Sequence, residues 1–218
     1  MERMTAAYRV TQATSEEIGW IAALEASVYS RHDAVPESVL REWYTCNPTG
    51  FSVVTAHGGT PVGHIDILPL RPVPLQEFLD GHILERELRG DSLYRNQERA
   101  SIRHVYVESV ILRPPEGRSP AAVMLALLSW IGEIFERVAD LRSLEAIYAI
   151  AATVRGDQLL RKLGFELLRP GSSRRDGHDL FVGRPLFVAR RLQAIVGEAV
   201  FDERTLGELL RAQPRRAP

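Results

Sequence analysis

The chain is poor in cysteine and in long apolar runs, and each shortage excludes a class of protein. Cys46 is its only cysteine, so the chain can form neither an internal disulfide nor a zinc site built from cysteines. The longest apolar stretch, residues 121–131, is shorter than a bilayer requires, and no apolar run follows the charged N-terminal residues. We therefore expect a cytoplasmic protein without a signal peptide or membrane span.

An excess of charge of one sign is also lacking. The net charge is −1 and the pI is about 6.6, whereas a nucleic-acid-binding face would need a basic excess. Lys162 is the only lysine among 27 basic residues, and we attribute the arginine excess to a composition bias. The six histidines show no helical pairing with a carboxylate, so we expect no metal. Nucleic acid and membrane are likewise not expected as partners.

What is present is an ordinary globular composition, with 45% hydrophobic residues and enough chain for a sizeable core. Residues 8–14 alternate like a strand, and Thr14 and Glu17 then have the spacing of a capping box at a helix start. Pro36 suits the first turn of a second helix. The apolar positions expected on the inner faces of these two helices are Ile18, Ile21, Leu24, Val28, Val39, Leu40 and Trp43.

Two strands and an unusual segment follow. Residues 50–68 predict two strands joined by a Gly-Gly hairpin turn. Within residues 69–100, three prolines break the strand, and the sequence LQEFLDGHILERELRG indicates helix. We interpret this segment as an insertion that covers a cleft or forms a dimer contact. Its apolar face is expected to consist of Phe78, Leu79, Ile83, Leu84 and Leu88.

The next elements alternate between strand and helix. Residues 101–112 predict a long strand, and Ser119-Pro120 provides a cap and a first helical residue for a long helix. Residues 144–152 are nearly all apolar, as in a central strand that is covered on both faces. The apolar stripe of the helix between them consists of Val123, Leu127, Ile131, Ile134 and Val138.

The sequence RKLGFELL, residues 161–168, joins a helix to a strand without a loop. A short helix from about residue 156 precedes Gly164, which suits the left-handed backbone that ends many helices. Phe165 starts a strand, and residues 178–183 are its expected partner. From Pro185 we expect one or two further helices and an arginine-rich end.

This order of elements resembles that of the GNAT superfamily of N-acyltransferases, over residues 8–182. The fragment LLRKLGF is the most recognisable family feature. The resemblance implies an α/β fold with a mixed, mostly antiparallel central sheet flanked by helices. It also implies that strands 101–112 and 144–152 are parallel and splayed at their C-terminal ends.

The resemblance also suggests how the domain is organised. Residues 1–184 would form the GNAT-like domain, with residues 70–100 as a helical insertion between its third and fourth strands. Residues 185–218 would be a C-terminal helical extension and tail.

The resemblance implies an acyl-CoA site along strand 101–112. In the family, this strand pairs with the pantetheine arm, and the next helix presents N–H groups to the pyrophosphate. The motif is degenerate here, because RSPAAV lacks the middle glycine and Pro120 lacks an N–H. Leu160 replaces the tyrosine that often protonates the departing thiolate. By position, the donor-binding residues would be Val110, Ile111, Leu112, Arg118, Ser119, Pro120, Ala121, Ala122 and Thr153.

Polar side chains gather on two of the expected strands. His104, Tyr106 and Glu108 share one face of strand 101–112, and His64 and Asp66 share a face of residues 62–68. If the strands pair, as the resemblance implies, these groups converge on one cleft. By this resemblance, Glu108 would act as the general base, with a pKa raised by burial. The residues that would bind the acceptor are His64, Asp66, His104 and Tyr106. The alternative is a structural hydrogen-bond network that ties the insertion to the sheet.

The implied function is transfer of an acyl group, most simply acetyl, from acetyl-CoA or another acyl-CoA to an amine of a small molecule or peptide. Two alternatives remain open. The lost glycine and tyrosine also fit a GNAT-like binding module without catalysis. An acyl-carrier protein or a long-chain acyl donor would instead relax the demand on the pyrophosphate loop. Assembly of the chain into a homodimer is also left open.

Overall fold

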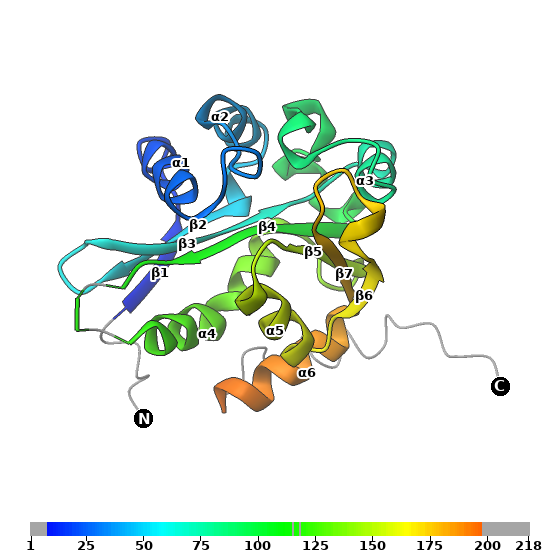
Figure 1. Ribbon diagram of the computed structural model, residues 1–218. Coiled ribbons are helices and arrows are strands. Elements are labelled where there is room, and N and C mark those ends of the chain that lie inside the picture. The colour runs from blue at the N-terminus through cyan, green and yellow to red at the C-terminus, as the bar shows by residue number, and fades with distance from the viewer. Residues whose placement is uncertain (1–7, 115, 118, 198–218) are drawn as a thin grey trace.

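The computed structural model describes residues 8–197 except residues 115 and 118. In this part of the chain, seven strands form one sheet in the order β1-β2-β3-β4-β5-β7-β6 (Figure 1). β4 and β5 are parallel, whereas all other neighbours are antiparallel, so the mixed, mostly antiparallel sheet is confirmed. The strands are β1 Tyr8–Gln12, β2 Phe51–Ala56, β3 Pro61–Leu68, β4 His104–Leu112, β5 Ala146–Ala151, β6 Glu166–Arg169 and β7 Asp179–Gly183.

Helices cover both faces of the sheet (Figure 1). On one face lie α1 Glu17–Val28, α2 Glu37–Cys46 and α3 Pro72–Leu79, and on the other lie α4 Pro120–Val138, α5 Val154–Lys162 and α6 Pro185–Val196. Each face has its own buried apolar cluster. None of the helices in the described ranges combines the length and apolar character needed to cross a membrane.

Short-range sequence signals are reproduced closely. The Thr14 N–H donates to Glu17 Oε2 at 2.8 Å, and the Glu17 N–H donates to Thr14 Oγ1 at 3.4 Å, as a capping box requires. Gly58 and Gly59 both have positive φ, +96° and +83°, in the hairpin turn between β2 and β3. All five residues of the expected α4 stripe are buried, and so are the three expected on α2.

The stripe expected on α1 is wrong at one position. Val28 is 49% exposed, whereas Glu25 is fully buried. The buried face of α1 contains residues 18, 21, 22 and 25, which follow the helical spacing of three and four residues. A carboxyl therefore occupies a position at which this pattern calls for an apolar side chain.

The insertion is helical only at its start. α3 ends at Leu79, Gly81 follows with φ +75°, and the short 3-10 turns η3 Glu85–Glu87, η4 Gly90–Ser92 and η5 Asn96–Ser101 replace the expected helix. The left-handed glycine interrupts the helical repeat. Phe78 and Leu88 are fully buried, and the Trp43 indole N–H donates to the Leu88 carbonyl at 3.2 Å. These residues belong to the core of the chain and cannot serve as a free dimer face.

The direct helix-to-strand junction has a local cause. Gly164 has φ +84°, and the N–H of Phe165 bonds to the Leu160 carbonyl at 3.0 Å, which closes the last turn of α5. A Cβ at Gly164 would lie 2.6 Å from Cε1 of Phe187 on α6. α6 in turn packs on α4 and contributes Leu186, Val188, Ala189 and Leu192 to the core. Residues 198–218, where the tail was expected, lie outside the described residues.

Candidate functional site

β4 and β5 part halfway along β4. Their parallel ladder joins His104–Val107 to Ala146–Ala149, whereas β4 continues to Leu112. The expected splay is therefore confirmed. Along the rest of β4, backbone N–H and C=O groups on this side have no β5 partner, so an extended ligand can pair with them.

A β-bulge lies at the parting point. On β3, Ile67 is opposite Val107 and Asp66 is opposite Ser109, so Glu108 is an extra residue on β4. Beyond it, Ser109 is buried and bonds to the Tyr29 hydroxyl at 3.2 Å. Val110 and Leu112 pack against the core on the α4 side. The bulge thus places Glu108 and Ser109 on the same side of the sheet and shifts the alternation that follows.

A cavity of about 200 Å³ lies at the parting point, on the face covered by α1 and α3. Four separate segments enclose it: the α1–α2 connection, the start of η3, the β4–β5 parting and the β6–β7 loop. Its volume suits a small acyl group or amine, since pockets for larger ligands are typically about 300–1,000 Å³. Its polar lining residues are Tyr29, His32, Asp33, Glu85, Arg86, Tyr106, Glu108, Arg175, Asp176 and His178.

Two carboxyls that line the cavity have raised pKa values. Burial raises the pKa of Glu85 to about 8, although a 2.5 Å hydrogen bond from the Tyr106 hydroxyl opposes the shift. Burial, followed by the negative charges of Glu25, Glu85 and Asp66, raises the pKa of Glu108 well above that of an exposed glutamate. One Glu108 oxygen, Oε2, is buried without a hydrogen-bond partner in the described part of the chain. The cleft therefore carries protonated acids at pH values at which exposed glutamates are ionised.

Loops close over the cavity through polar contacts. His178 Nε2 lies 3.0 Å from Asp33 Oδ1, which joins the β6–β7 loop to the α1–α2 connection. Arg175 donates to the His82 carbonyl at 2.6 Å and pairs with Glu87 in the insertion. The insertion thus lies over this part of the cleft.

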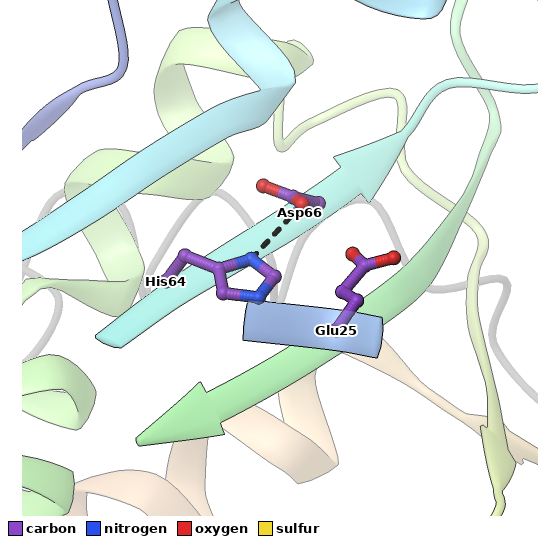
Figure 2. Close-up of side chains that lie close together, drawn as sticks. All are labelled: Glu25, His64 and Asp66. Atoms are coloured by element: carbon purple, nitrogen blue, oxygen red, sulfur yellow. Dashed lines mark hydrogen bonds and ion pairs between the residues drawn. The ribbon is translucent and has the colours of Figure 1, made fainter. Parts of the chain in front are cut away.

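His64 and Asp66 do not line the cavity. They project from β3 toward Glu25 of α1, and His64 Nδ1 lies 3.0 Å from Asp66 Oδ2 (Figure 2). All three side chains are fully buried. Burial raises the pKa of Glu25 to about 9, with Asp66 and Glu85 adding to the shift and the Val35 backbone opposing it.

His104 is also separate from the cavity. It lies at the start of β4, where its Nε2 is 3.7 Å from Glu145 Oε2 and burial lowers its pKa. Of the five polar groups expected to converge, only Tyr106 and Glu108 line the cavity in the described structure.

The donor-side residues lie around the open end of β4. Ser119 precedes α4, but its hydroxyl makes no capping hydrogen bond, in contrast to the expectation from sequence. Pro120 begins α4, and Ala121 and Ala122 are exposed in its first turn. Arg118 lies outside the described residues. Thr153 Oγ1 accepts from the Gly156 N–H at 3.0 Å, so it caps α5.

Sequence reasoning missed several residues that build the site. Tyr29, Asp33 and His178 reach the cavity from loops and carry no periodic signal. Glu85 was hidden in a segment expected to be helical. Glu25 did have a signal, because it stands seven residues after Ile18 on the buried stripe of α1.

Comparison with known proteins gives a likeness of fold. No protein-family model matches the chain, and no curated protein matches its sequence. The loading GNATL domain of CurA from Lyngbya majuscula is 15% identical with a TM-score of 0.55, and the match covers 82% of this chain and 98% of that one. The GphF GNAT-like decarboxylase, solved with isobutyryl-CoA, is also 15% identical, with a TM-score of 0.55 and coverage of 81% and 99%.

The C-terminal condensation domain of Ebony, solved with beta-alanyl-dopamine, is 12% identical. Its TM-score is 0.51, and the match covers 81% of this chain and 98% of that one. Many further solved structures match as well. At such low identities these matches establish that the chain has the GNAT fold.

Proposed function

We propose that this GNAT-fold protein transfers an acyl group from acyl-CoA to an amine. The observation that carries the proposal is the parting of β4 from β5 after Val107, directly beside a cavity that Glu108 lines. The free β4 backbone would pair with the amide groups of pantetheine, and the cavity would receive the acceptor. A GNAT-fold neighbour solved with isobutyryl-CoA, and another with beta-alanyl-dopamine, support a site of this kind.

The donor would lie along Val110, Ile111 and Leu112. Its pyrophosphate would approach the start of α4, where Ser119 provides no side-chain cap and the first-turn N–H groups favour an anion. Pro120 removes one N–H from that turn. The Ala122 N–H already donates to the Ser119 carbonyl at 3.1 Å, so recognition of pyrophosphate would rest mainly on the Ala121 N–H and on Arg118.

Glu108 would act as the general base. Glu108 first takes one proton from the bound ammonium ion, and the neutral amine then attacks the thioester carbon. The C–S bond breaks, and the leaving thiolate takes the second proton of the nitrogen by way of water. Amines enter as ammonium ions at neutral pH. Charge pairing with an ammonium favours the ionised carboxylate, so it opposes the effect of burial on the pKa of Glu108.

Glu108→Gln tests this role, because the amide keeps the size of the side chain but cannot accept the proton. We expect kcat/KM to fall about a hundred- to ten-thousandfold, measured by thiol release from acetyl-CoA and isobutyryl-CoA with a panel of amines. The parent rate should rise with pH as the raised pKa of Glu108 is passed, and the variant should lose this rise. Glu166→Gln, an exposed change on β6, is the control.

The other outcomes are equally specific. An active, pH-responsive Glu108→Gln variant would place the base elsewhere, with Glu85 and His178, which also line the cavity, next to test. Calorimetry with no heat from any CoA thioester at millimolar concentration would refute the CoA donor. It would leave an acyl-carrier protein as donor, or a binding module without catalysis.

A second function is decarboxylation of a CoA thioester that carries a carboxylate on its α-carbon. The raised pKa values of Glu85 and Glu108 favour it, because the cleft then offers proton donors. The bond between the carboxylate and the α-carbon breaks, CO₂ leaves, and Glu108 protonates the resulting enolate. Release of CO₂ from malonyl-CoA without an amine would support this reaction, and intact malonyl-CoA would exclude it.

A further inference from the structure

The structure buries Glu25, His64 and Asp66 against one another between α1 and β3 (Figure 2). One potential ligand atom from each residue lies within 4.8 Å of the other two. Both oxygens of Glu25, Nε2 of His64 and Oδ1 of Asp66 are buried without a hydrogen-bond partner among the described residues. Such unpaired groups are costly in a protein interior, so the cluster favours a bound partner, although the backbones of Val35 and Ser52 oppose the rise in the pKa of Glu25 and Asp66.

The charge of the cluster indicates the nature of that partner. As metal ligands, two carboxylates and one imidazole nitrogen would carry a charge of −2, which a divalent cation would balance. Glu25 forms no ion pair with an arginine in the described structure, and the carboxyls of Asp66, Glu85 and Glu108 add negative potential around it. Without a cation, the same burial can be tolerated only if the carboxyls keep their protons.

We propose that Glu25, His64 and Asp66 bind a divalent transition-metal ion, Zn²⁺ in the first instance. Imidazole and carboxylate donors suit zinc, and three protein ligands with a water in the fourth position form a common zinc arrangement. The ion joins α1, which carries Glu25, to β3, which carries His64 and Asp66. The sequence did not reveal this set, because its members come from a helix and a strand and lack the two-histidine spacing of helical zinc sites.

The first measurement is the metal content of the full chain, purified through a tag without histidine. We expect inductively coupled plasma mass spectrometry to find about one zinc ion per chain. Because the three side chains are fully buried, the ion is enclosed on folding, so the protein is also unfolded with a chelator and refolded with and without Zn²⁺. At a hundredfold excess over Kd, zinc should raise Tm by about 5–10 °C.

Glu25→Gln and Asp66→Asn remove one ligand each at nearly constant volume and should abolish both the bound zinc and the Tm shift. Asp33→Asn is the matched control. This substitution changes the His178–Asp33 pair, which has the same 3.0 Å separation as the His64–Asp66 pair but is partly exposed. The Asp33→Asn variant should keep the zinc.

Three results would overturn the proposal. The parent chain could contain no metal and show no Tm shift after refolding with Zn²⁺, Mn²⁺ or Ni²⁺. The cluster would then be a neutral group in which Glu25 stays protonated. Zinc retained in both ligand variants would place the ion elsewhere. If the variants fail to fold, equal Tm values for the parent refolded in chelator and in zinc would decide against the site.

Discussion

Replacing Glu85 by Gln should make the protein more stable at neutral and alkaline pH. The pKa of Glu85 is about 8 in the folded state, against 4.5 for an exposed glutamate. The folded state therefore keeps a proton that the unfolded chain releases above pH 4.5. Stability is lost as pH rises from 4.5 to 8, which is the direction expected for an acid whose folded pKa is raised.

The magnitude follows from this difference. One pKa unit corresponds to about 1.36 kcal/mol, so the cost of Glu85 at pH 7 is at most about 3 kcal/mol. Water in the adjoining cavity screens part of this cost, and we expect Glu85→Gln to gain about 1–3 kcal/mol. The amide oxygen can still accept the hydrogen bond from the Tyr106 hydroxyl. The gain should shift Tm by about 2–4 °C per kcal/mol.

The assay is urea unfolding of both proteins between pH 5 and pH 8.5. The other carboxyls with raised pKa values also make both proteins less stable as pH rises. The informative quantity is therefore the difference in unfolding free energy between variant and parent, which should grow with pH. Glu87→Gln is the control, because the Leu84 backbone and Arg175 lower the pKa of this exposed neighbour and its removal should not stabilise. A Glu85→Gln variant that is less stable than the parent at pH 8 would refute the reasoning.

Two further changes test the packing. Leu88→Ala should lower the unfolding free energy by about 2–5 kcal/mol in urea, because Leu88 is fully buried. Leu125→Ala, at a 43% exposed position, is the control and should cost less than about 0.5 kcal/mol. Equal costs would show that the insertion is not part of the core. Gly164→Ala should cost roughly 2 kcal/mol or more, from its φ of +84° and the 2.6 Å approach to Phe187. Adding Phe187→Ala should recover the steric part, and no recovery would assign the whole cost to the backbone.

Much of the fold could be predicted from sequence because its signals are local. The capping box at Thr14, the hairpin glycines and the α4 stripe each depend on residues within a few positions of one another, and the structure reproduces them. Gly164 belongs to the same class, since a left-handed residue after a helix favours glycine wherever it occurs. The order of these elements also sufficed to indicate the GNAT fold.

The site was less predictable because it is assembled from distant segments. Alternation placed Tyr106 and Glu108 on one face, and both line the cavity. The bulge at Glu108 arises from pairing with β3, however, and only the paired strands show that Ser109 joins the same side. His104 keeps the expected strand position but lies too near the start of β4 to reach the cavity.

By itself, the sequence determined the strands, the main helices and their order, because helix caps, turns and apolar periodicity act between neighbours along the chain. The tertiary structure decided the chemistry. It buried Glu25 beside His64, brought Glu85 of the insertion to Tyr106, and closed the cavity with the His178–Asp33 contact. The pKa values of these carboxyls depend on burial and on charges that approach only through space, so no local pattern could have specified them.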